Sequence, residues 1–305
     1  MSHDIEQLAQ KARAASAALA ALSTQTKNAC LTSMADLIEA NAAAIKQANE
    51  RDLAAAREAG LGDAKIRRLT LTDTGVKQMA EGLRQVAALP DPVGQVTRES
   101  TVPSGLRVKK VRCPIGVIMM IYEARPNVTI DAFALCFKSG NACILKGGRE
   151  AAHSNRALAD LAAQALGRHG VSADAVALLT TSDREEIKAL LRLDQYIDLV
   201  IPRGGAELIR FVHEHSRIPM VQHFHGVCHI FVDESAELER AVQICATAKT
   251  SGPATCNAVE ALLVHERIAP KFVPMLGKRL AADNVELRGD ESVQKLAPSA
   301  KAATD

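Results

Sequence analysis

Residues 3–90 place apolar and polar side chains at the spacing of amphipathic helices. Alanine, leucine, glutamate, glutamine and lysine dominate, and apolar residues recur at helical intervals in "MADLIEANAAAIKQA" (34–48). Pro90 and Pro92 end this pattern. Residues 96–112 then alternate on either side of a Pro-Ser-Gly turn, which predicts a β-hairpin. The chain is therefore expected to begin with a helical lead-in followed by a hairpin.

Beyond residue 114 the pattern changes to short, almost continuously apolar runs that alternate with amphipathic segments. The runs predict strands and the segments between them predict helices, two of which should end at Gly140 and Gly170. Strands that are apolar throughout belong to parallel sheets covered by helices on both faces. The expected strands are 114–122, 141–146, 175–180 and 197–202, and the expected helices are 127–140, 149–170, 182–193 and 205–215.

The last part of the chain continues this alternation. Strands are expected at 218–223, 227–233 and 258–265, and helices at 235–249 and 269–283. The polar tail "APSAKAATD" (297–305) is expected to fray. We therefore place one domain over residues 1–232 and the opening part of a second domain over residues 233–305.

Composition and charge narrow the class of protein. The 305 residues are 48% hydrophobic and 24% charged, with a net charge of +2, so neither nucleic acid nor an anionic membrane is favoured as a partner. Tryptophan is absent, which argues against stacking of single-stranded bases. The N-terminus lacks the apolar core of a signal peptide, and the apolar runs are too short to cross a bilayer. A cytoplasmic protein is expected.

Seven cysteines are spread along the chain without a CxxC pair, so most are expected to be reduced and structural. Cys256 differs from the others in its place. It ends the loop "SGPATC" (251–256), directly ahead of an apolar run, whereas a structural cysteine normally lies inside such a run. Catalytic groups collect on loops held between rigid elements, so Cys256 is the candidate nucleophile. The alternative is an inert loop thiol.

Two strand ends share a second candidate feature. In "ILKGGRE" (144–150) and "VIPRGGAE" (200–207) an apolar strand leads through a basic residue and a Gly-Gly pair into a helix. Glycines allow a ligand to approach closely, and a helix N-terminus offers N–H groups to phosphate. Ligands of open parallel sheets bind at the carboxyl ends of strands. Both turns are candidate phosphate sites, although Gly-Gly is also common in turns that bind nothing.

The segment "HFHGVCHIFVD" (223–233) contains residue types that bind metals. It holds three histidines and a cysteine, so a zinc site has to be considered. Cys228 and His229 would point to opposite faces of the expected strand, and no second cluster with ligand spacing follows. We therefore expect no metal site, and place these histidines at a strand end beside a cleft.

Two long stretches of the sequence closely resemble γ-glutamyl phosphate reductases, a branch of the aldehyde dehydrogenase superfamily. They are "PIGVIMMIYEARPNVTIDAFALCFKSGNACILKGGREAAHSN" (114–155) and "TSGPATCNAVEALLVH" (250–265). The resemblance implies an aldehyde-dehydrogenase-like α/β fold, with a parallel Rossmann-type cofactor sheet in 1–232 and part of an α/β catalytic domain in 233–305. It also implies NADPH-dependent reduction of γ-glutamyl 5-phosphate to glutamate 5-semialdehyde in proline biosynthesis, with release of phosphate.

The resemblance assigns catalytic roles to particular residues. Cys256 matches the thiolate that attacks the acyl phosphate and forms an enzyme thioester, which hydride then reduces. In "YEARPNV", Arg125 and Asn127 lie near the position of the superfamily's oxyanion donor. Arg125 is therefore expected to hold the departing phosphate, and Asn127 the developing oxyanion.

The resemblance assigns cofactor-binding roles as well. Lys146, followed by Gly147–Gly148, matches the lysine that reaches the adenosine ribose. Many NAD-preferring relatives carry an acidic residue three positions after this lysine, where this chain has Arg149. A cation there suits a 2′-phosphate, so NADP(H) is the expected cofactor. The pair Gly204–Gly205 matches the turn before the helix that binds the cofactor's pyrophosphate.

The sequence departs from the superfamily pattern in two respects. The glutamate base of hydrolytic aldehyde dehydrogenases is missing near "HGVCHIFV", which suits a thioester that is resolved by hydride. Family members continue well beyond the position of Asp305, so a truncated form with poor turnover is expected. The family also implies a homo-oligomer and a functional link to glutamate 5-kinase. The alternatives are another acylating or hydrolytic aldehyde dehydrogenase, or a non-catalytic nucleotide- or metal-binding module on this fold.

Overall fold

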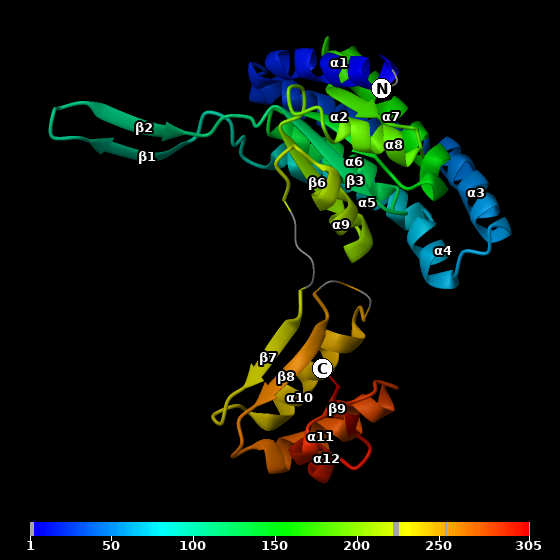
Figure 1. Cartoon of the computed structure of the whole chain (residues 1–305), viewed down its shortest axis with the longest axis vertical. Helices are drawn as coiled ribbons and strands as arrows, with labels where there is room; N and C mark the ends of the chain where they lie inside the picture. The colour runs from blue at the N-terminus through cyan, green and yellow to red at the C-terminus, as the bar shows by residue number, and fades with distance from the viewer. Residues whose placement is uncertain (1–2, 222–225, 254, 256, 305) are drawn as a thin grey trace. The chain divides into compact units, whose positions relative to one another are not determined.

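The computed structural model describes residues 3–221, 226–253, 255 and 257–304. Its internal contacts divide the chain into unit 1, residues 1–222, and unit 2, residues 223–305. Figure 1 shows the helices and strands of both units. The division falls ten residues ahead of the boundary set from the sequence, so the strand Cys228–Val232 belongs to unit 2.

Helices α1 to α5 form the N-terminal part of unit 1, as the apolar spacing predicts. Leu31, Met34 and Ile38 lie on one face of α2 and are fully buried. Helix α1 packs against the central sheet, whereas α2, α3 and α5 pack around α6 and α7. The N-terminal helices therefore help to cover the sheet. Their bounds are α1 His3–Ala20, α2 Thr24–Ala40, α3 Ala42–Glu58, α4 Asp63–Leu69 and α5 Asp73–Ala88.

A buried ion pair holds the start of α2 against the segment after α5. Lys27 is 1% exposed and its Nζ lies 2.9 Å from Asp91 Oδ2. Burial alone would raise the pKa of Asp91, but hydrogen bonds from Lys27, the Val93 amide and Thr24 lower it below its usual value. The ionised carboxylate therefore stabilises the fold above the ordinary aspartate pKa, and this contribution is lost as the pH falls below it.

Asp91→Asn is expected to lower the free energy of unfolding by about 3 kcal/mol at pH 7, because Lys27 stays buried without its counter-charge. The difference from wild type should shrink as the pH falls below about 4, the ordinary aspartate pKa, because the unfolded chain then binds a proton that folded Asp91 resists. Urea unfolding of both proteins at pH 7 and below about pH 4 measures this difference in the free energy of unfolding. Asp73→Asn is the control, since the Lys46–Asp73 pair is solvent-exposed and should contribute little to stability. Equal midpoints for Asp91→Asn and wild type at pH 7 would contradict the assignment.

The antiparallel hairpin expected at 96–112 is present. It consists of β1 (Val96–Thr101) and β2 (Arg107–Val111), and it extends away from the rest of unit 1 (Figure 1). Its residues are almost all exposed, and β2 is exposed along its whole length. The hairpin therefore takes no part in the core of unit 1.

The central sheet of unit 1 is parallel, with the strand order β5-β4-β3-β6. Every residue of β4 is buried, although successive side chains point to opposite faces, so both faces are covered as predicted. Along the chain, β4 and β5 are added on one side of β3, and the next strand, β6, is added on the other side of β3. Open α/β sheets bind ligands at such a switch point. The bounds are β3 Val117–Tyr122, α6 Asn127–Lys138, β4 Ala142–Lys146, η1 Arg149–Ala151, α7 Ala152–Arg168, η2 Ala173–Ala175, β5 Val176–Leu178, α8 Arg184–Leu190, β6 Leu199–Arg203 and α9 Ala206–His215.

Two segments differ from the expected secondary structure. The strand expected at 218–223 is reduced to a single bridge between Met220 and Val200, and residues 222–223 lie outside the described part. The tail was expected to fray, but Lys301–Ala302 pairs with Arg288–Gly289 in parallel. Burial of Ala300 beside Val273 explains why this polar segment is held. Small apolar residues in the tail supply contacts that its composition conceals.

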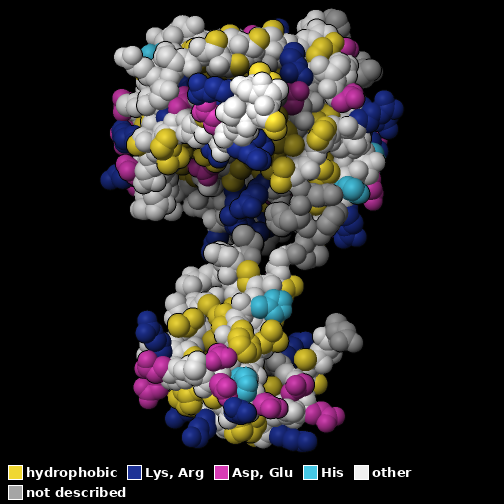
Figure 2. Space-filling view, turned by 90° about the vertical axis from the view of Figure 1, so that its left-hand side faces the viewer, with side chains coloured by type: hydrophobic (Ala, Val, Ile, Leu, Met, Phe, Trp, Pro, Cys, Tyr) yellow, Lys and Arg dark blue, Asp and Glu magenta, His cyan; other side chains and the backbone are white. Residues whose placement is uncertain are grey.

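Unit 2 is built on a parallel pair of strands, β7 and β8. One face packs on α10 and α11, with Val232, Val242 and Phe272 in the core. On the opposite face Phe231 and Leu263 are neighbours across the strands and are 60% and 55% exposed. Hydrophobic side chains are visible at the surface of this unit in Figure 2. The bounds are β7 Cys228–Val232, α10 Leu238–Thr250, β8 Val259–Val264, α11 Ala269–Ala282, β9 Arg288–Gly289, α12 Glu291–Leu296 and β10 Lys301–Ala302.

The uncovered face of β7 and β8 predicts self-association of this chain. Exposed apolar strands pair readily with other copies, and a lysine on the strand surface opposes such pairing. Leu263→Lys is therefore expected to lower the apparent mass measured by light scattering across a concentration series. Ile244→Lys, at a 53% exposed position of α10, is the control and should change little. A monodisperse wild-type monomer at every concentration would contradict the prediction.

No helix in the described ranges is long and apolar enough to cross a membrane.

Candidate active site

The residues assigned to the cofactor and to the oxyanion lie in unit 1, at the carboxyl ends of neighbouring strands. Ile121 of β3 pairs with Lys146 of β4, and Tyr122 of β3 pairs with Arg203 of β6. The turns that follow these strands therefore share one edge of the sheet, at the switch point. They carry Arg125 and Asn127 after β3, Gly147, Gly148 and Arg149 after β4, and Gly204 and Gly205 after β6.

The turn after β4 lines a small cleft that also reaches the end of β5. The cleft has a volume of about 30 Å³ and opens at the sheet edge. It contains the whole of the predicted ribose-binding segment. The lining residues are Lys146, Gly147, Gly148, Arg149, Ala152, Asn155, Leu178, Leu179, Thr180 and Thr181.

Two cations belong to this cleft. Lys146 is 8% exposed and its Nζ donates to the carbonyl oxygen of Gly147 at 2.6 Å. Burial lowers the pKa of Lys146, and the nearby charge of Glu150 opposes this shift. Arg149 is exposed and has no ion-pair partner among the residues that the structure describes. The cleft can therefore accept an anionic group, with Arg149 as the unpaired cation.

Gly147 and Gly148 stand at positions where a side chain would meet neighbouring atoms. A Cβ on Gly147 would collide with Asn155 Nδ2, which belongs to a buried side chain. A Cβ on Gly148 would lie 2.7 Å from the Glu150 carboxylate, which is the mobile end of a longer side chain. Gly147 is thus the stricter requirement, and it lets the turn lie directly on Asn155.

The N-terminus of α7 is capped by a side chain of α3. Asp52 accepts hydrogen bonds from the backbone N–H groups of His153 (3.0 Å) and Ser154 (2.8 Å), and from Ser154 Oγ (2.6 Å). Asp52 is only 3% exposed. The N–H groups expected to be free after "ILKGGRE" are therefore occupied at these two residues, and anion contacts in the cleft would come from side chains.

A carboxylate also stands at the N-terminus of α9. Glu123 Oε1 accepts a hydrogen bond from the backbone N–H of Gly205 at 2.9 Å. A Cβ on Gly204 would lie 2.7 Å from the same oxygen. This helix N-terminus holds a carboxylate oxygen where the resemblance places a phosphate, so the two would compete for the Gly205 N–H.

The two residues assigned to the oxyanion and the phosphate are exposed at the start of α6. Asn127 Nδ2 donates to Asp131 Oδ2 at 3.2 Å, one helical turn along. Arg125 presents its side chain to solvent. Arg125 and the second amide hydrogen of Asn127 are therefore the donors available at this turn.

The predicted nucleophile belongs to unit 2, and Cys256 lies outside the described residues. It falls between the end of α10 at Thr250 and the start of β8 at Val259. His223 and His225 also lie outside the described part. Among the residues that are described, no group of three or more histidine, cysteine, aspartate or glutamate side chains is placed to hold a metal ion.

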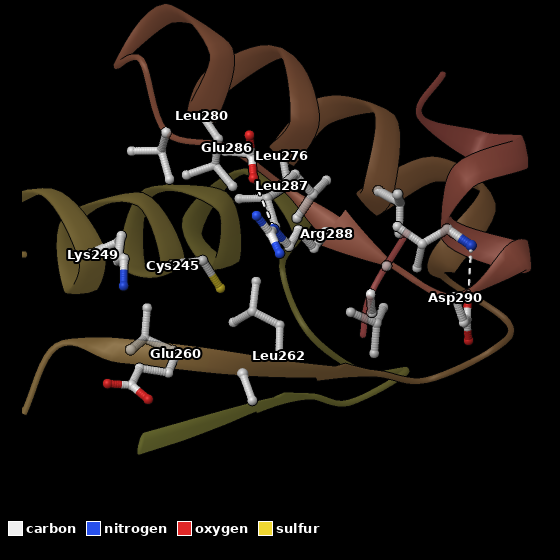
Figure 3. Close-up of a pocket in the computed structure, with 18 of the residues that line it drawn as sticks. Cys245, Lys249, Glu260, Leu262, Leu276, Leu280, Glu286, Leu287, Arg288 and Asp290 are labelled. Atoms are coloured by element: carbon white, nitrogen blue, oxygen red, sulfur yellow. Dashed lines mark hydrogen bonds and ion pairs between the residues drawn. The ribbon is translucent and has the colours of Figure 1, made fainter. Parts of the chain in front are cut away.

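A larger cavity in unit 2 contains none of the predicted site residues. It measures about 610 Å³ and lies between α10, β8, α11 and β9 (Figure 3). Its charged groups include Glu286, which forms an ion pair with Arg288 at 2.8 Å. Cys245 also lines the cavity, and burial raises the pKa of its thiol. The rest of the lining is mainly aliphatic. We interpret this cavity as a groove beside β8 and not as a reaction centre.

Comparison with known proteins places this geometry in a family. The aldehyde dehydrogenase family profile matches residues 1–303. A protein of Xanthomonas campestris named gamma-glutamyl phosphate reductase is 50% identical over 301 residues, which cover 99% of this chain and 73% of the relative. A protein of Opitutus terrae with the same name is 54% identical, over 95% of this chain and 69% of the relative.

Solved structures agree with this result. The crystal structure of gamma-glutamyl phosphate reductase from Thermotoga maritima superposes with a TM-score of 0.94 at 39% identity, covering 99% of this chain and 73% of that one. The Saccharomyces cerevisiae enzyme of that name gives 0.68 at 34% identity, covering 100% and 80%. Aldehyde dehydrogenases use nicotinamide cofactors. The expected α/β fold is thus confirmed, and the chain belongs to the aldehyde dehydrogenase family, within its γ-glutamyl phosphate reductase branch.

Proposed function

We propose that this chain reduces γ-glutamyl 5-phosphate to glutamate 5-semialdehyde with NADPH and releases phosphate, a step of proline biosynthesis. The main support is sequence identity: about half of the aligned residues, over nearly the whole chain, are identical to those of proteins named gamma-glutamyl phosphate reductase. The cationic cleft after β4 supports the cofactor part of the proposal. The substrate is thus a small molecule.

The cleft suits NADP(H) because its charges match a phosphorylated ribose. Lys146 would hold the ribose, and Arg149, which lacks an ion-pair partner among the described residues, would hold the 2′-phosphate. Gly147 and Gly148 leave room for the approach. When bound, the nicotinamide supplies a hydride to the acyl carbon.

The Gly204–Gly205 turn would contact the pyrophosphate of the same cofactor. The Gly205 N–H and the positive end of the α9 dipole favour an anion there. Glu123 holds this N–H in the structure, so its carboxylate has to move aside when a phosphate arrives.

Cys256 would form the covalent intermediate. Its thiolate attacks the acyl carbon, the bond between that carbon and the phosphate oxygen breaks, and phosphate leaves with the electron pair. After hydride has reached the thioester carbon, the carbon–sulfur bond breaks, the aldehyde is released and the thiolate is regenerated. Asn127 would donate to the carbonyl oxygen as negative charge develops, and Arg125 would hold the departing phosphate.

The reverse reaction tests the proposal. The chain is incubated with glutamate 5-semialdehyde, NADP⁺ and inorganic phosphate, and NADPH formation is followed by its absorbance. NADPH should form only when phosphate is present. Formation with coenzyme A in place of phosphate would support an acyl-CoA-linked aldehyde dehydrogenase, and formation with neither would support a hydrolytic one.

A further inference from the structure

Asn155, in the first turn of α7, is a buried polar residue for which the proposed reaction has no role so far. It is 2% exposed, yet it lines the cleft after β4. Its Oδ1 accepts a hydrogen bond from Thr129 Oγ1 at 3.0 Å. Its Nδ2 lies against Gly147 and has no hydrogen-bond acceptor among the residues that the structure describes. The oxygen of Asn155 is engaged by Thr129, so the amide N–H2, which has no acceptor among the described residues, is the donor available to a ligand in the cleft.

A chain of hydrogen bonds fixes which end of the Asn155 amide faces the cleft. Thr129 gives its one hydroxyl hydrogen to Asn155 and therefore accepts from the Tyr122 hydroxyl, at 2.8 Å. If the amide were reversed, Asn155 would donate to Thr129, and Thr129 could either donate to Tyr122 or accept from it as well. In either case one hydroxyl hydrogen, that of Tyr122 or that of Thr129, would lack an acceptor among the hydrogen bonds of the described residues, although both side chains are at most 2% exposed. The oxygen of Asn155 thus faces Thr129, and its N–H2 faces the cleft.

The surroundings of this donor define the ligand atom that it can bind. Lys146 and Arg149 belong to the same cleft, so the ligand group should be an anionic or oxygen-rich acceptor. A volume of about 30 Å³ admits one or two groups of the size of a water molecule. One ligand oxygen can therefore enter beside Gly147, while the rest of the ligand lies outside.

We propose that Asn155 is a cofactor-binding residue whose side-chain N–H2 donates a hydrogen bond to an oxygen of the phosphorylated adenosine ribose of NADP(H). Tyr122 and Thr129 are positioning residues that hold the amide in this orientation. The proposal rests on the proposed function, because it takes NADP(H) as the ligand of the cleft.

Asn155→Asp separates a binding role from a structural one. The carboxylate can still accept from Thr129, but it presents an acceptor to the cleft where the wild type presents a donor. Binding of NADPH, followed by its own fluorescence, and of 2′,5′-ADP, followed by calorimetry, should both weaken at least about thirtyfold. Gln164→Glu makes the same chemical change at an exposed position of α7 and should leave both affinities within about twofold. Wild-type affinity in Asn155→Asp, or a loss for NADPH without a loss for 2′,5′-ADP, would overturn the proposal.

A second pair of variants covers the case in which Asn155→Asp does not fold, which its circular dichroism would reveal. Thr129→Val removes the hydroxyl that holds the amide and should weaken both ligands about threefold to tenfold. Thr129→Ser keeps the hydroxyl and should recover most of this loss. Equal binding by the valine variant, the serine variant and wild type would overturn the role of Asn155. If wild type itself binds neither NADPH nor 2′,5′-ADP, the proposed function fails instead.

Discussion

Replacing Cys256 with alanine is expected to abolish phosphate-dependent oxidation of glutamate semialdehyde, with kcat falling by at least about 10⁴-fold. The thioester cannot form without the thiol, and no other group takes over its nucleophilic role. Binding of NADPH should stay within about twofold of wild type, because the proposed cofactor residues all lie in unit 1. Steady-state kinetics and a fluorescence titration measure the two quantities separately.

Thiol labelling gives an independent test of the same assignment. A nucleophilic cysteine reacts as its thiolate, whereas burial suppresses ionisation. Burial raises the pKa of Cys30 to about 11 and also raises that of Cys245. Among the described cysteines, Cys113 is the exposed one and is the reference thiol.

Iodoacetamide at neutral pH should therefore modify Cys256 faster than Cys113, as measured by peptide mass spectrometry. The variant Cys113→Ala should retain wild-type activity, which controls for the loss of a thiol as such. Activity in Cys256→Ala, or faster labelling of Cys113, would refute the nucleophile assignment.

Most of the fold could be predicted because the sequence pattern reflects burial directly. The run "VIMMIY" is apolar at every position, and a run this short between turn signals is typical of a strand covered on both faces. Gly140 and Gly170 follow helices at φ values of 77° and 70°, a region that favours glycine, so those helix ends were predictable as well.

The secondary structure was predicted wrongly at 218–223 and in the tail 297–305. In both places the structure depends on contacts with segments that lie elsewhere in the sequence. Met220 makes only a bridge to Val200, and apolar composition alone could not show how short that pairing would be. The tail is held by the pairing of Lys301 with Arg288 and by the burial of Ala300. A polar composition favours fraying only when no partner strand is available.

The candidate site divides along the same line. Lys146 and Arg149 could be proposed as cofactor-binding residues because a motif at a strand end, together with the family resemblance, points to them, and both line the cleft. Asp52, Glu123 and Asn155 were missed because each acts through a hydrogen-bond partner that is distant along the chain. The partners of Asp52 and Glu123 lie 82 to 102 residues away, and the partner of Asn155 lies 26 residues away. Each of these residues is polar and ordinary in its local sequence. Their importance arises only when the fold brings them to the sheet edge.

Arg149→Glu is expected to lower the ratio of NADPH affinity to NADH affinity about 100-fold. The substitution replaces attraction to the 2′-phosphate by repulsion, whereas NADH carries no phosphate at that position. Because Arg149 is exposed, salt should screen part of its attraction to the 2′-phosphate. The ratio of NADPH affinity to NADH affinity of the wild type should therefore fall between 0.05 and 0.5 M salt, about the range over which the Debye length falls below 10 Å. Fluorescence titrations with both cofactors, at both salt concentrations, measure this.

The matched control is Arg156→Glu, which makes the same charge change on α7. Arg156 is also exposed, lies 3.7 Å from Asp160 and is not one of the residues that line the cleft. Its substitution should weaken both cofactors to a similar, small extent, because it alters the net charge of unit 1 without touching the ribose site. If Arg149→Glu and Arg156→Glu give the same ratio as wild type, Arg149 only begins the short helix η1. The 2′-phosphate would then be held elsewhere, and the choice of NADP(H) over NAD(H) would lose its physical basis.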